Sequence, residues 1–239
     1  MHGDLPTFNN FLLDSLPAAT IEVLRPHLRE VELAVGEQLY QQDVIPPSVY
    51  FPVTAVVSKY QILEEGSVIE IALGGNEGAV GLAPTLVLKG SIHYSEVLIA
   101  GKSYKVPAGR VLELSRRDNV FQIKANDILQ GHIQQVSRRM ICNQYHTLEP
   151  RLATWLLMVS ERCGSSTLRV THDQMARALG FFRPSVTLAV QALKEKGAVA
   201  QSRGRVTITR RDKLHKIACE CFETLSLASA AKSSLPQQF

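Results

Sequence analysis

The chain has 239 residues, of which 45% are hydrophobic, and a net charge of +4. This length exceeds that of most single domains and supplies apolar side chains for two cores, so we expect two domains. No run approaches the roughly 18 consecutive apolar residues of a membrane span, and no basic stretch followed by an apolar run opens the chain, so we expect a cytoplasmic protein without a membrane partner.

The charge is unevenly divided along the chain. Residues 1–136 contain 10 basic and 15 acidic side chains, a net charge of −5, whereas residues 137–239 contain 16 basic and 7 acidic side chains, a net charge of +9. A basic region is what the neutralisation of nucleic-acid phosphates requires, and an acidic region is not expected to touch DNA. A solvated basic surface without a partner is the alternative, so the charge needs support from a structural motif.

All four cysteines lie in the C-terminal 100 residues: Cys142, Cys163, Cys219 and Cys221. No disulfide framework therefore spans the chain, and a reducing compartment is expected. On a helix, residues two positions apart point about 200° away from each other. Cys219 and Cys221 are therefore predicted to be ordinary thiols, and we predict neither a metal site nor a cofactor.

The first part of the chain predicts a β domain behind one helix. After a helix over 16–28, β-branched runs replace the helical period. The runs 56–63 and 68–73 are joined by Glu64-Glu65-Gly66-Ser67, a hairpin signal. We expect a small antiparallel barrel or roll. Further short strands are predicted at 49–51, 95–99 and 103–106.

A long helical segment begins near Asp118, and a leucine-rich helix over 148–159 follows it. Between polar residues, the first helix carries a narrow apolar stripe with spacings of four, three and four. Such a stripe is typical of a coiled-coil seam, so we predict a homodimer; packing on the same domain is the alternative. The stripe consists of Leu129, Ile133, Val136 and Met140.

A helix-turn-helix is predicted in the basic half of the chain. Thr171 followed by Gln174 forms a capping box, and Gly180 ends that helix in a sharp turn. The next helix begins at Arg183-Pro184-Ser185, because proline is favoured in a first turn. Its buried face is expected to consist of Val186, Val190 and Leu193.

A small hairpin follows this second helix. The segments 199–202 and 205–208 flank Arg203-Gly204, which suits a tight turn. In a winged helix-turn-helix, the second helix places its first residues in the major groove, while the wing and the capping hydroxyl contact phosphates. Thr171, Arg203 and Arg205 are therefore candidate phosphate contacts.

Several motifs carry a resemblance to a known family. They are Val49-Tyr50-Phe51-Pro52, Gly75-Asn76-Glu77-Gly78-Ala79-Val80-Gly81, Cys142-Asn143-Gln144-Tyr145-His146, Arg151-Leu152-Ala153-Thr154-Trp155-Leu156-Leu157-Met158 and Arg183-Pro184-Ser185-Val186. With the order of elements, they resemble the catabolite activator (CRP/FNR) superfamily over nearly the whole chain. The resemblance implies an α+β fold. Its parts would be a cyclic-nucleotide-binding-like sensor β-roll at 1–117, a dimerisation helix at 118–145 and a winged helix-turn-helix domain at 146–239.

The resemblance also implies a function and roles for individual residues. A homodimeric transcription regulator would bind a near-palindromic operator in double-stranded DNA and act with RNA polymerase. Arg183 matches the arginine that family members aim at O6 and N7 of a guanine, and Ser185 and Thr187 lie on the same turn. Pro184 and Leu188 replace the glutamate and arginine of the catabolite activator, so its operator sequence is not transferred.

A sensor pocket in the β-roll is a further implication, with an effector that the sequence does not identify. In relatives that bind cyclic nucleotides, a Gly-Glu pair contacts the ribose and an Arg-Ser pair holds the phosphate. Glu77, beside Gly78, is similar to the first pair. Ser95 is similar to the serine, but Tyr94 stands at the arginine position. A buried phosphate would lack its charged partner, so cyclic AMP is not expected to bind.

Two other classes of function are the alternatives. An enzyme would use Cys142 with His146, or Glu64 with Glu65, but neither pair has a third orienting group or a nucleophile motif, so we expect no catalysis. A ligand-binding module whose helix-turn-helix mediates only protein contacts is the second alternative. A salt-dependent affinity for DNA would separate it from a regulator.

Overall fold

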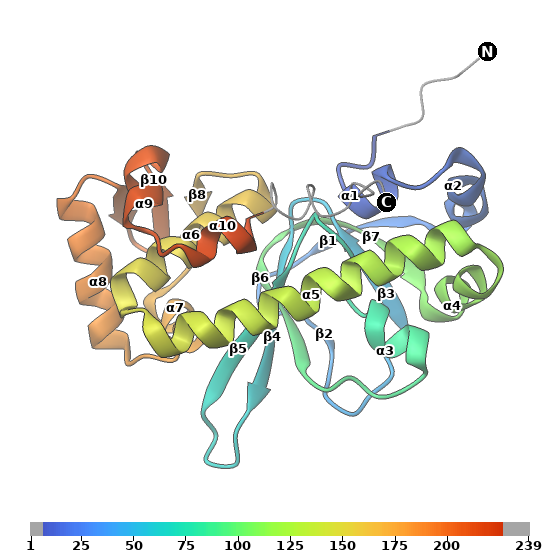
Figure 1. The fold of residues 1–239 in the computed structure, drawn as a ribbon, viewed down its shortest axis with the longest axis horizontal. Helices are drawn as coiled ribbons and strands as arrows, with labels where there is room; N and C mark the ends of the chain where they lie inside the picture. Colours follow the sequence, from blue (N-terminus) through green and yellow to red (C-terminus); the bar gives the residue numbers. More distant parts are fainter. Residues whose placement is uncertain (1–6, 227–239) are drawn as a thin grey trace, which may run out of the picture. The chain divides into compact units, whose positions relative to one another are not determined.

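The computed structural model describes residues 7–226, which form two compact units. The first unit contains residues 7–57 and 74–131, and the second contains residues 58–73 and 132–226. Each unit is therefore built from two separate stretches of the chain (Figure 1).

Antiparallel strands form the framework of the first unit, as the sequence predicts. Strand β7 lies between β1 and β3, with Val49 opposite Val106, and β2 pairs with β6. The predicted strands at 49–51, 95–99 and 103–106 are confirmed. The sequence did not predict β1, because three of its five residues are charged and exposed, or β2, because a strand of three residues gives no periodic pattern. The strands are β1 (Arg29–Leu33), β2 (Gln38–Tyr40), β3 (Ser48–Pro52), β6 (Tyr94–Ile99) and β7 (Gly101–Pro107).

Short helices flank these strands. The helix predicted over 16–28 is shorter than expected, because it starts after Pro17 and gives way to a 3-10 turn around Pro26, which has no N–H for an α-helical bond. Helix α4 occupies a segment that the sequence assigned to the roll without a helix. The helical elements are α1 (Phe11–Asp14), α2 (Ala18–Leu24), the 3-10 turn η1 (Arg25–His27), α3 (Leu82–Val87) and α4 (Ala108–Arg117).

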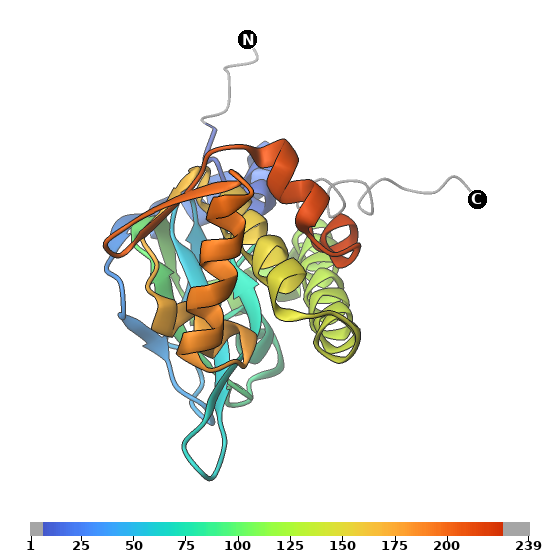
Figure 2. The same ribbon diagram turned by 90° about the vertical axis from the view of Figure 1, so that its left-hand side faces the viewer.

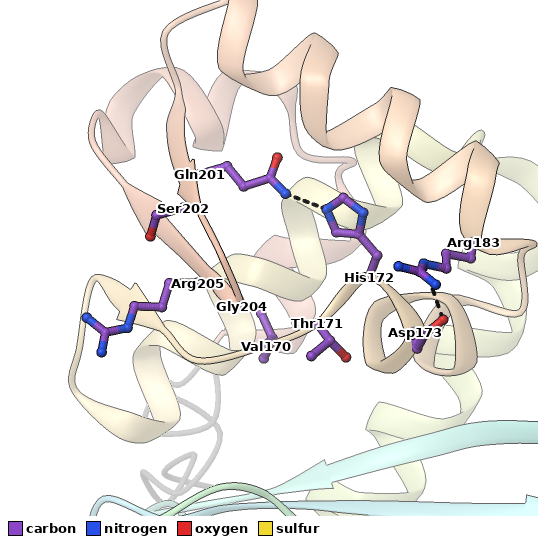
Figure 3. A pocket seen from close by; sticks show the side chains of 9 residues that line it. All are labelled: Val170, Thr171, His172, Asp173, Arg183, Gln201, Ser202, Gly204 and Arg205. Carbon is purple, nitrogen blue, oxygen red and sulfur yellow. Dashed lines mark hydrogen bonds and ion pairs between the residues drawn. The ribbon is translucent and has the colours of Figure 1, made fainter.

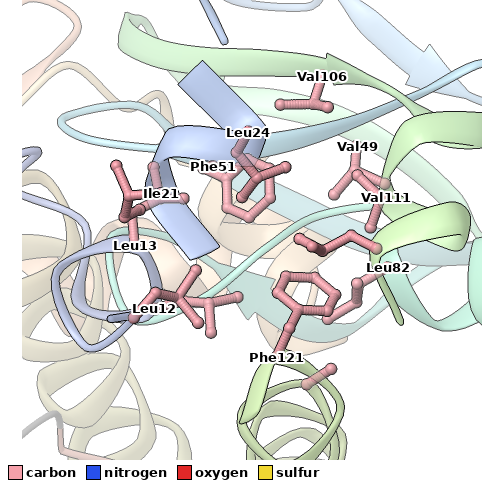
Figure 4. Close-up of a cluster of buried hydrophobic side chains, with 13 residues drawn as sticks. Leu12, Leu13, Ile21, Leu24, Val49, Phe51, Leu82, Val106, Val111 and Phe121 are labelled. Carbon is pink, nitrogen blue, oxygen red and sulfur yellow. The ribbon is translucent and has the colours of Figure 1, made fainter. Parts of the chain in front are cut away.

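Helices and strands of the first unit share one apolar core (Figure 4). Phe51 of β3 and Phe121 are its largest side chains, and both are fully buried. Around them pack leucines and isoleucine from α1 and α2 and valines from β3, β7 and α4. Burial of this surface, at about 25 cal/mol per Å², is what holds the short helices on the strands.

The long helix α5 (Asn119–Tyr145) begins in the first unit and ends in the second. The carboxylate of Asp118 accepts hydrogen bonds from the N–H groups of Val120 and Phe121, at 2.9 and 3.0 Å. These bonds satisfy donors that the first turn of a helix leaves without partners. The predicted start of this helix near Asp118 is confirmed.

The second unit combines a hairpin with the C-terminal helices. In the hairpin of β4 and β5, Leu63 donates to the Ser67 carbonyl at 2.8 Å, and Gly66 takes the positive φ that its turn requires. The hairpin predicted around residues 64–67 is therefore confirmed. The elements are β4 (Val56–Ile62), β5 (Val68–Gly74), α6 (Leu148–Cys163), β8 (Thr167–Leu168), α7 (His172–Leu179), α8 (Arg183–Glu195), β9 (Val199–Ser202), β10 (Arg205–Ile208), α9 (Arg211–Ile217) and α10 (Cys221–Leu225).

Helix α6 is the centre of the C-terminal part. It is buried on almost all sides and contacts α7, α8, α9 and α10. The single tryptophan, Trp155, is 2% exposed within it. Its buried polar side chains, among them Arg151 and Thr154, have hydrogen-bond partners, as burial in a core requires.

The two cysteines near the C-terminus do not lie on one helix. Helix α9 ends at Ile217 and α10 begins at Cys221, so Cys219 lies in the connection between them. The rotation of 100° per residue does not apply there. The prediction that Cys219 and Cys221 point apart is wrong, since their sulfur atoms lie within 4.8 Å of each other.

Among residues 7–226, no helix has both the length and the apolar character needed to cross a bilayer.

Candidate nucleic-acid interface

Helix α7 is the first helix of the predicted helix-turn-helix. The Thr171 hydroxyl accepts from the Gln174 N–H at 3.2 Å, and the Gln174 side chain accepts from the Thr171 N–H at 2.8 Å. This reciprocal pair is the predicted capping box. At the other end, Gly180 has a φ of +70°, which turns the chain sharply toward α8.

Helix α8 presents one apolar and one exposed face. It begins at Arg183 with Pro184 in its first turn, and Val186, Val190 and Leu193 are completely buried, as predicted. Leu188 on the other face is 68% exposed. Burial of the apolar face fixes the rotation of the helix about its axis and so defines the exposed face. Figure 2 views the second unit from the side on which α8 (orange) lies.

A three-stranded sheet of order β8-β10-β9 follows α8. Ser202 is opposite Arg205 in the β9–β10 hairpin, and Gly204 in the turn has a φ of +69°. The predicted wing is therefore present, with Arg203 at its tip. Arg203 and Arg205 are both exposed.

A chain of hydrogen bonds joins the wing to the first turn of α8. Nε2 of Gln201 lies 2.6 Å from Nε2 of His172, whose Nδ1 lies 2.8 Å from the Thr187 hydroxyl (Figure 3). Thr187 in turn donates to the Arg183 carbonyl at 3.0 Å. An imidazole protonated at Nδ1 pairs a donor with an acceptor at each step. Sequence reasoning missed His172 and Gln201, because a single histidine or glutamine gives no pattern.

Arg183 is exposed but paired. Its Nε lies 3.5 Å from the Asp173 carboxylate on α7, with both side chains more than half exposed. Such a pair contributes about 0–1 kcal/mol, so a stronger partner can replace Asp173. Both side chains line an open pocket between α7, α8 and the wing, where Arg205 extends to the side opposite Arg183 (Figure 3).

Three of the predicted DNA contact residues line one pocket, and the others lie outside its lining. Thr171, Arg183 and Arg205 line this same pocket. Thr187 is tied to the first turn of α8, and Ser185 is half-buried. A surface built from α7, the start of α8 and the wing therefore carries these groups.

Two buried arginines hold the C-terminal end of α7. Arg139 donates to the Ala178 carbonyl at 2.8 Å, and Arg151 donates to the Leu179 carbonyl at 2.6 Å. The Arg151 guanidinium also lies 4.9 Å from the Phe181 ring centroid. Burial lowers the pKa of Arg151 from its ordinary value. Both groups satisfy carbonyls that the last turn of a helix leaves without partners.

The predicted dimer stripe on α5 is mostly exposed in the single chain. Ile133 is 58% exposed and Met140 is 70% exposed, while Val136 is exposed to a lesser degree and Leu129 is half-buried. An exposed row of apolar side chains on one helix is typical of a surface that binds another protein surface.

The predicted effector residues lie in the first unit. Gly78 is packed against α5, because a Cβ there would lie 2.9 Å from Cγ2 of Ile128. Ser95 is buried and its neighbour Tyr94 is half-buried on β6, where successive side chains point to opposite faces. Glu77 is half-buried.

The enzyme candidates are divided between two places. Glu64 and Glu65 lie in the exposed turn of the β4–β5 hairpin. Cys142 and His146, in contrast, lie at the end of α5 beside two other cysteines.

Comparison with known proteins finds a family model that is similar to the C-terminal part of the chain. Residues 150–217 match the model of the Crp-like helix-turn-helix domain. This range includes α7, α8 and the wing. No curated protein matches the chain.

Solved structures with the same fold extend over most of the chain. FixK2 from Bradyrhizobium japonicum is 19% identical, with a TM-score of 0.69, and the match covers 80% of this chain and 98% of FixK2. A transcriptional regulator of the CRP family from Thermus thermophilus is 19% identical, with a TM-score of 0.66 and coverage of 79% and 96%. A putative Crp/Fnr regulator from Eubacterium rectale is 18% identical, with a TM-score of 0.65 and coverage of 86% and 96%.

Proposed function

We propose that this protein is a transcription regulator that binds double-stranded DNA sequence-specifically as a homodimer. The CRP/FNR fold and the match of residues 150–217 to the Crp-like helix-turn-helix domain support this proposal. One observation carries the proposal: Arg183 is exposed at the start of α8, beside the wing. The basic charge of residues 137–239 supports it further.

Helix α8 is the proposed reading helix. Its first turn carries Arg183, whose guanidinium has the fork geometry for O6 and N7 of guanine. The Asp173 carboxylate holds that fork in the free protein, and a guanine would replace it. The hydrogen bonds from Thr187 through His172 to Gln201 of the wing hold the first turn of α8 in place. The entropy cost of ordering this turn on DNA binding is therefore smaller.

The remaining contacts are proposed for phosphates. Arg203 and Arg205 on the wing are exposed and carry no sequence information by themselves. The Thr171 hydroxyl donates to the Gln174 side chain at 3.1 Å in the free protein, and we propose that a phosphate oxygen takes the place of this acceptor on DNA. These contacts would set affinity and its salt dependence.

The dimer is proposed to form through the apolar stripe of α5. Two copies of the helix would cover Ile133, Val136 and Met140, which are exposed in one chain. A two-fold axis then requires two half-sites, so the operator would be near-palindromic. Contact with RNA polymerase and control by an effector in the β-roll are further parts of the proposal.

Selection from random duplexes would test this function. The full chain should enrich a near-palindromic sequence, and its affinity for that sequence should fall as salt rises, with a slope of several units. Retention of DNA without any enriched sequence would contradict sequence-specific regulation. Absence of binding at low salt would favour the module that makes only protein contacts.

A further inference from the structure

Four side chains with metal-binding atoms converge at the end of α5. One ligand atom from each lies within 4.8 Å of those of the other three. The three thiols are buried and the imidazole is half-buried. The residues, here called the thiol cluster, are Cys142, His146, Cys219 and Cys221.

We propose that the thiol cluster binds one zinc ion. Zinc in structural sites is tetrahedral, with Zn–S near 2.3 Å and Zn–N near 2.0–2.1 Å, so neighbouring ligand atoms are roughly 3.5–3.8 Å apart. The sulfur atoms of Cys142 and Cys219 are 3.5 Å apart, and Sγ of Cys221 is 3.6 Å from Nδ1 of His146. Both pairs have the spacing of ligands around one ion.

The chain brings the ligands together through two short segments. Cys142 lies in the last turn of α5 and His146 directly follows the helix, where its N–H donates to the Cys142 carbonyl at 3.1 Å and continues the helical hydrogen-bond pattern. Residues four positions apart in this pattern lie on one face of a helix. Cys219 lies in the connection between α9 and α10, and Cys221 is the first residue of α10, where the Phe222 N–H donates to the Cys219 carbonyl at 3.0 Å.

Thr154 on α6 holds Cys219 in place. The sulfur of Cys219 lies 3.1 Å from the Thr154 hydroxyl, which also accepts from the Cys219 N–H at 3.2 Å. The outer-shell partners of a metal site orient its ligands in this way.

The ligand types and the short distances between the ligand atoms favour a single zinc ion. Sulfur and imidazole ligands suit zinc, whereas calcium and magnesium require oxygen. A cluster of two or four iron ions would divide the four ligands among different irons and so spread them further apart. A disulfide between Cys142 and Cys219 needs a distance near 2.05 Å and would leave Cys221 and His146 without a role.

A zinc ion here would tie the last two helices to α5. Cys219 and Cys221 lie about 75 residues beyond Cys142 and His146 in the sequence. Binding energy at a structural zinc site is folding energy, since the unfolded chain has no assembled site. The second unit should therefore unfold at a lower temperature once a chelator has removed the ion.

Metal content and cobalt spectra would test the proposal. The full chain, purified under reducing conditions without added chelator, should retain about one zinc ion per chain by elemental mass spectrometry. The metal-free chain titrated with Co²⁺ should show the intense visible bands of a tetrahedral site and sulfur-to-cobalt charge transfer, and Zn²⁺ should abolish them.

Variants assign the site to these residues. Cys219→Ser and His146→Gln should each lower zinc affinity by more than the 10–100-fold typical of losing an outer-shell partner. His146 is half-buried, so its replacement should leave the fold intact, which circular dichroism would check. Cys163→Ser is the matched control, because Cys163 is buried but lies outside the thiol cluster.

Two results would overturn the proposal. One is a reduced, folded chain that retains no metal and shows no cobalt bands at micromolar Co²⁺. The other is an equal loss of cobalt binding in Cys163→Ser and Cys219→Ser. Peptide mass spectrometry that finds a Cys142–Cys219 disulfide in the freshly purified, metal-free chain would assign the thiol cluster to redox chemistry instead.

Discussion

The guanidinium of Arg139 on α5 binds the carboxylate of Glu70 on β5 inside the second unit, at 2.8 Å. Both side chains are buried. The carboxylate also accepts from the Trp155 indole at 3.0 Å and from the Ser58 hydroxyl at 2.7 Å. Because Arg139 donates to the Ala178 carbonyl as well, one arginine links the hairpin, α5 and α7.

Arg139→Met should destabilise the second unit by about 3–5 kcal/mol, because it leaves the Glu70 carboxylate buried without its cation. Urea unfolding followed by the fluorescence of Trp155, the single tryptophan, would measure this. The double variant Arg139→Met/Glu70→Leu should recover much of the loss, since no lone charge remains buried. A loss below about 1 kcal/mol in the single variant would mean that water reaches Glu70.

Arg183→Ala should weaken binding to the selected operator by about 1–3 kcal/mol and binding to random DNA little, because Arg183 is proposed to read a base edge. Fluorescence anisotropy on both duplexes at several salt concentrations would measure the difference. Equal losses on the two duplexes would remove Arg183 from base reading.

Arg203→Ala is the matched comparison at the wing tip. It should weaken binding to the operator and to random DNA equally. The slope of the logarithm of the affinity against the logarithm of the salt concentration should fall in magnitude by about one, as expected for one lost phosphate contact. An effect confined to the operator would instead assign Arg203 to sequence recognition.

Ile133→Glu should produce monomers and weaken operator binding steeply, because it puts a charge in the proposed seam of α5. Analytical ultracentrifugation at micromolar concentration would give the oligomeric state. Val23→Glu, on an exposed apolar position of α2, is the control and should remain dimeric. A wild-type chain that binds its operator as a monomer would show that this stripe is no dimer seam.

His172→Ala and Gln201→Ala should each weaken operator binding, because both break the hydrogen-bond chain from the wing to α8. Residues in one such network couple by about 0.5–3 kcal/mol, so the double variant should lose less than the sum of the single variants. Fluorescence anisotropy with the operator would give the affinities of the wild type, the two single variants and the double variant. Strictly additive losses would mean that these hydrogen bonds are not formed on DNA.

Cyclic AMP should not bind at micromolar concentration, because the family resemblance implies that Tyr94 replaces the arginine with which cyclic-nucleotide-binding relatives hold the phosphate. Isothermal calorimetry with the full chain would test this. Saturable heat at micromolar ligand would show that another cation, such as Lys89, holds the phosphate.

The elements with strong local signals were predictable from the sequence. The capping box at Thr171, the turn at Gly180 and the wing turn at Gly204 each depend on a few neighbouring residues, and all three are present. The α5 and α6 helices have long periodic patterns, so their starts were predicted closely.

Features that depend on distant residues were not predictable. The bond from Glu70 to Arg139 and the chain through His172 join residues far apart in sequence. For Cys219, the wrong prediction arose from one local assumption, namely that α9 continues past Ile217. Because α9 ends at Ile217, before Cys219, the thiols of Cys219 and Cys221 lie close together instead of pointing apart.

The β4–β5 hairpin packs with the C-terminal half although it lies in the first third of the sequence. This has a consequence for protein engineering. A chimera made by cutting within α5, with the N-terminal half of another protein of this fold joined to the C-terminal half of this one, would exchange residues 58–73 for a foreign hairpin. Arg139 would then meet an unmatched partner, so a graft that keeps its stability must carry Glu70 and its strand along with the C-terminal half.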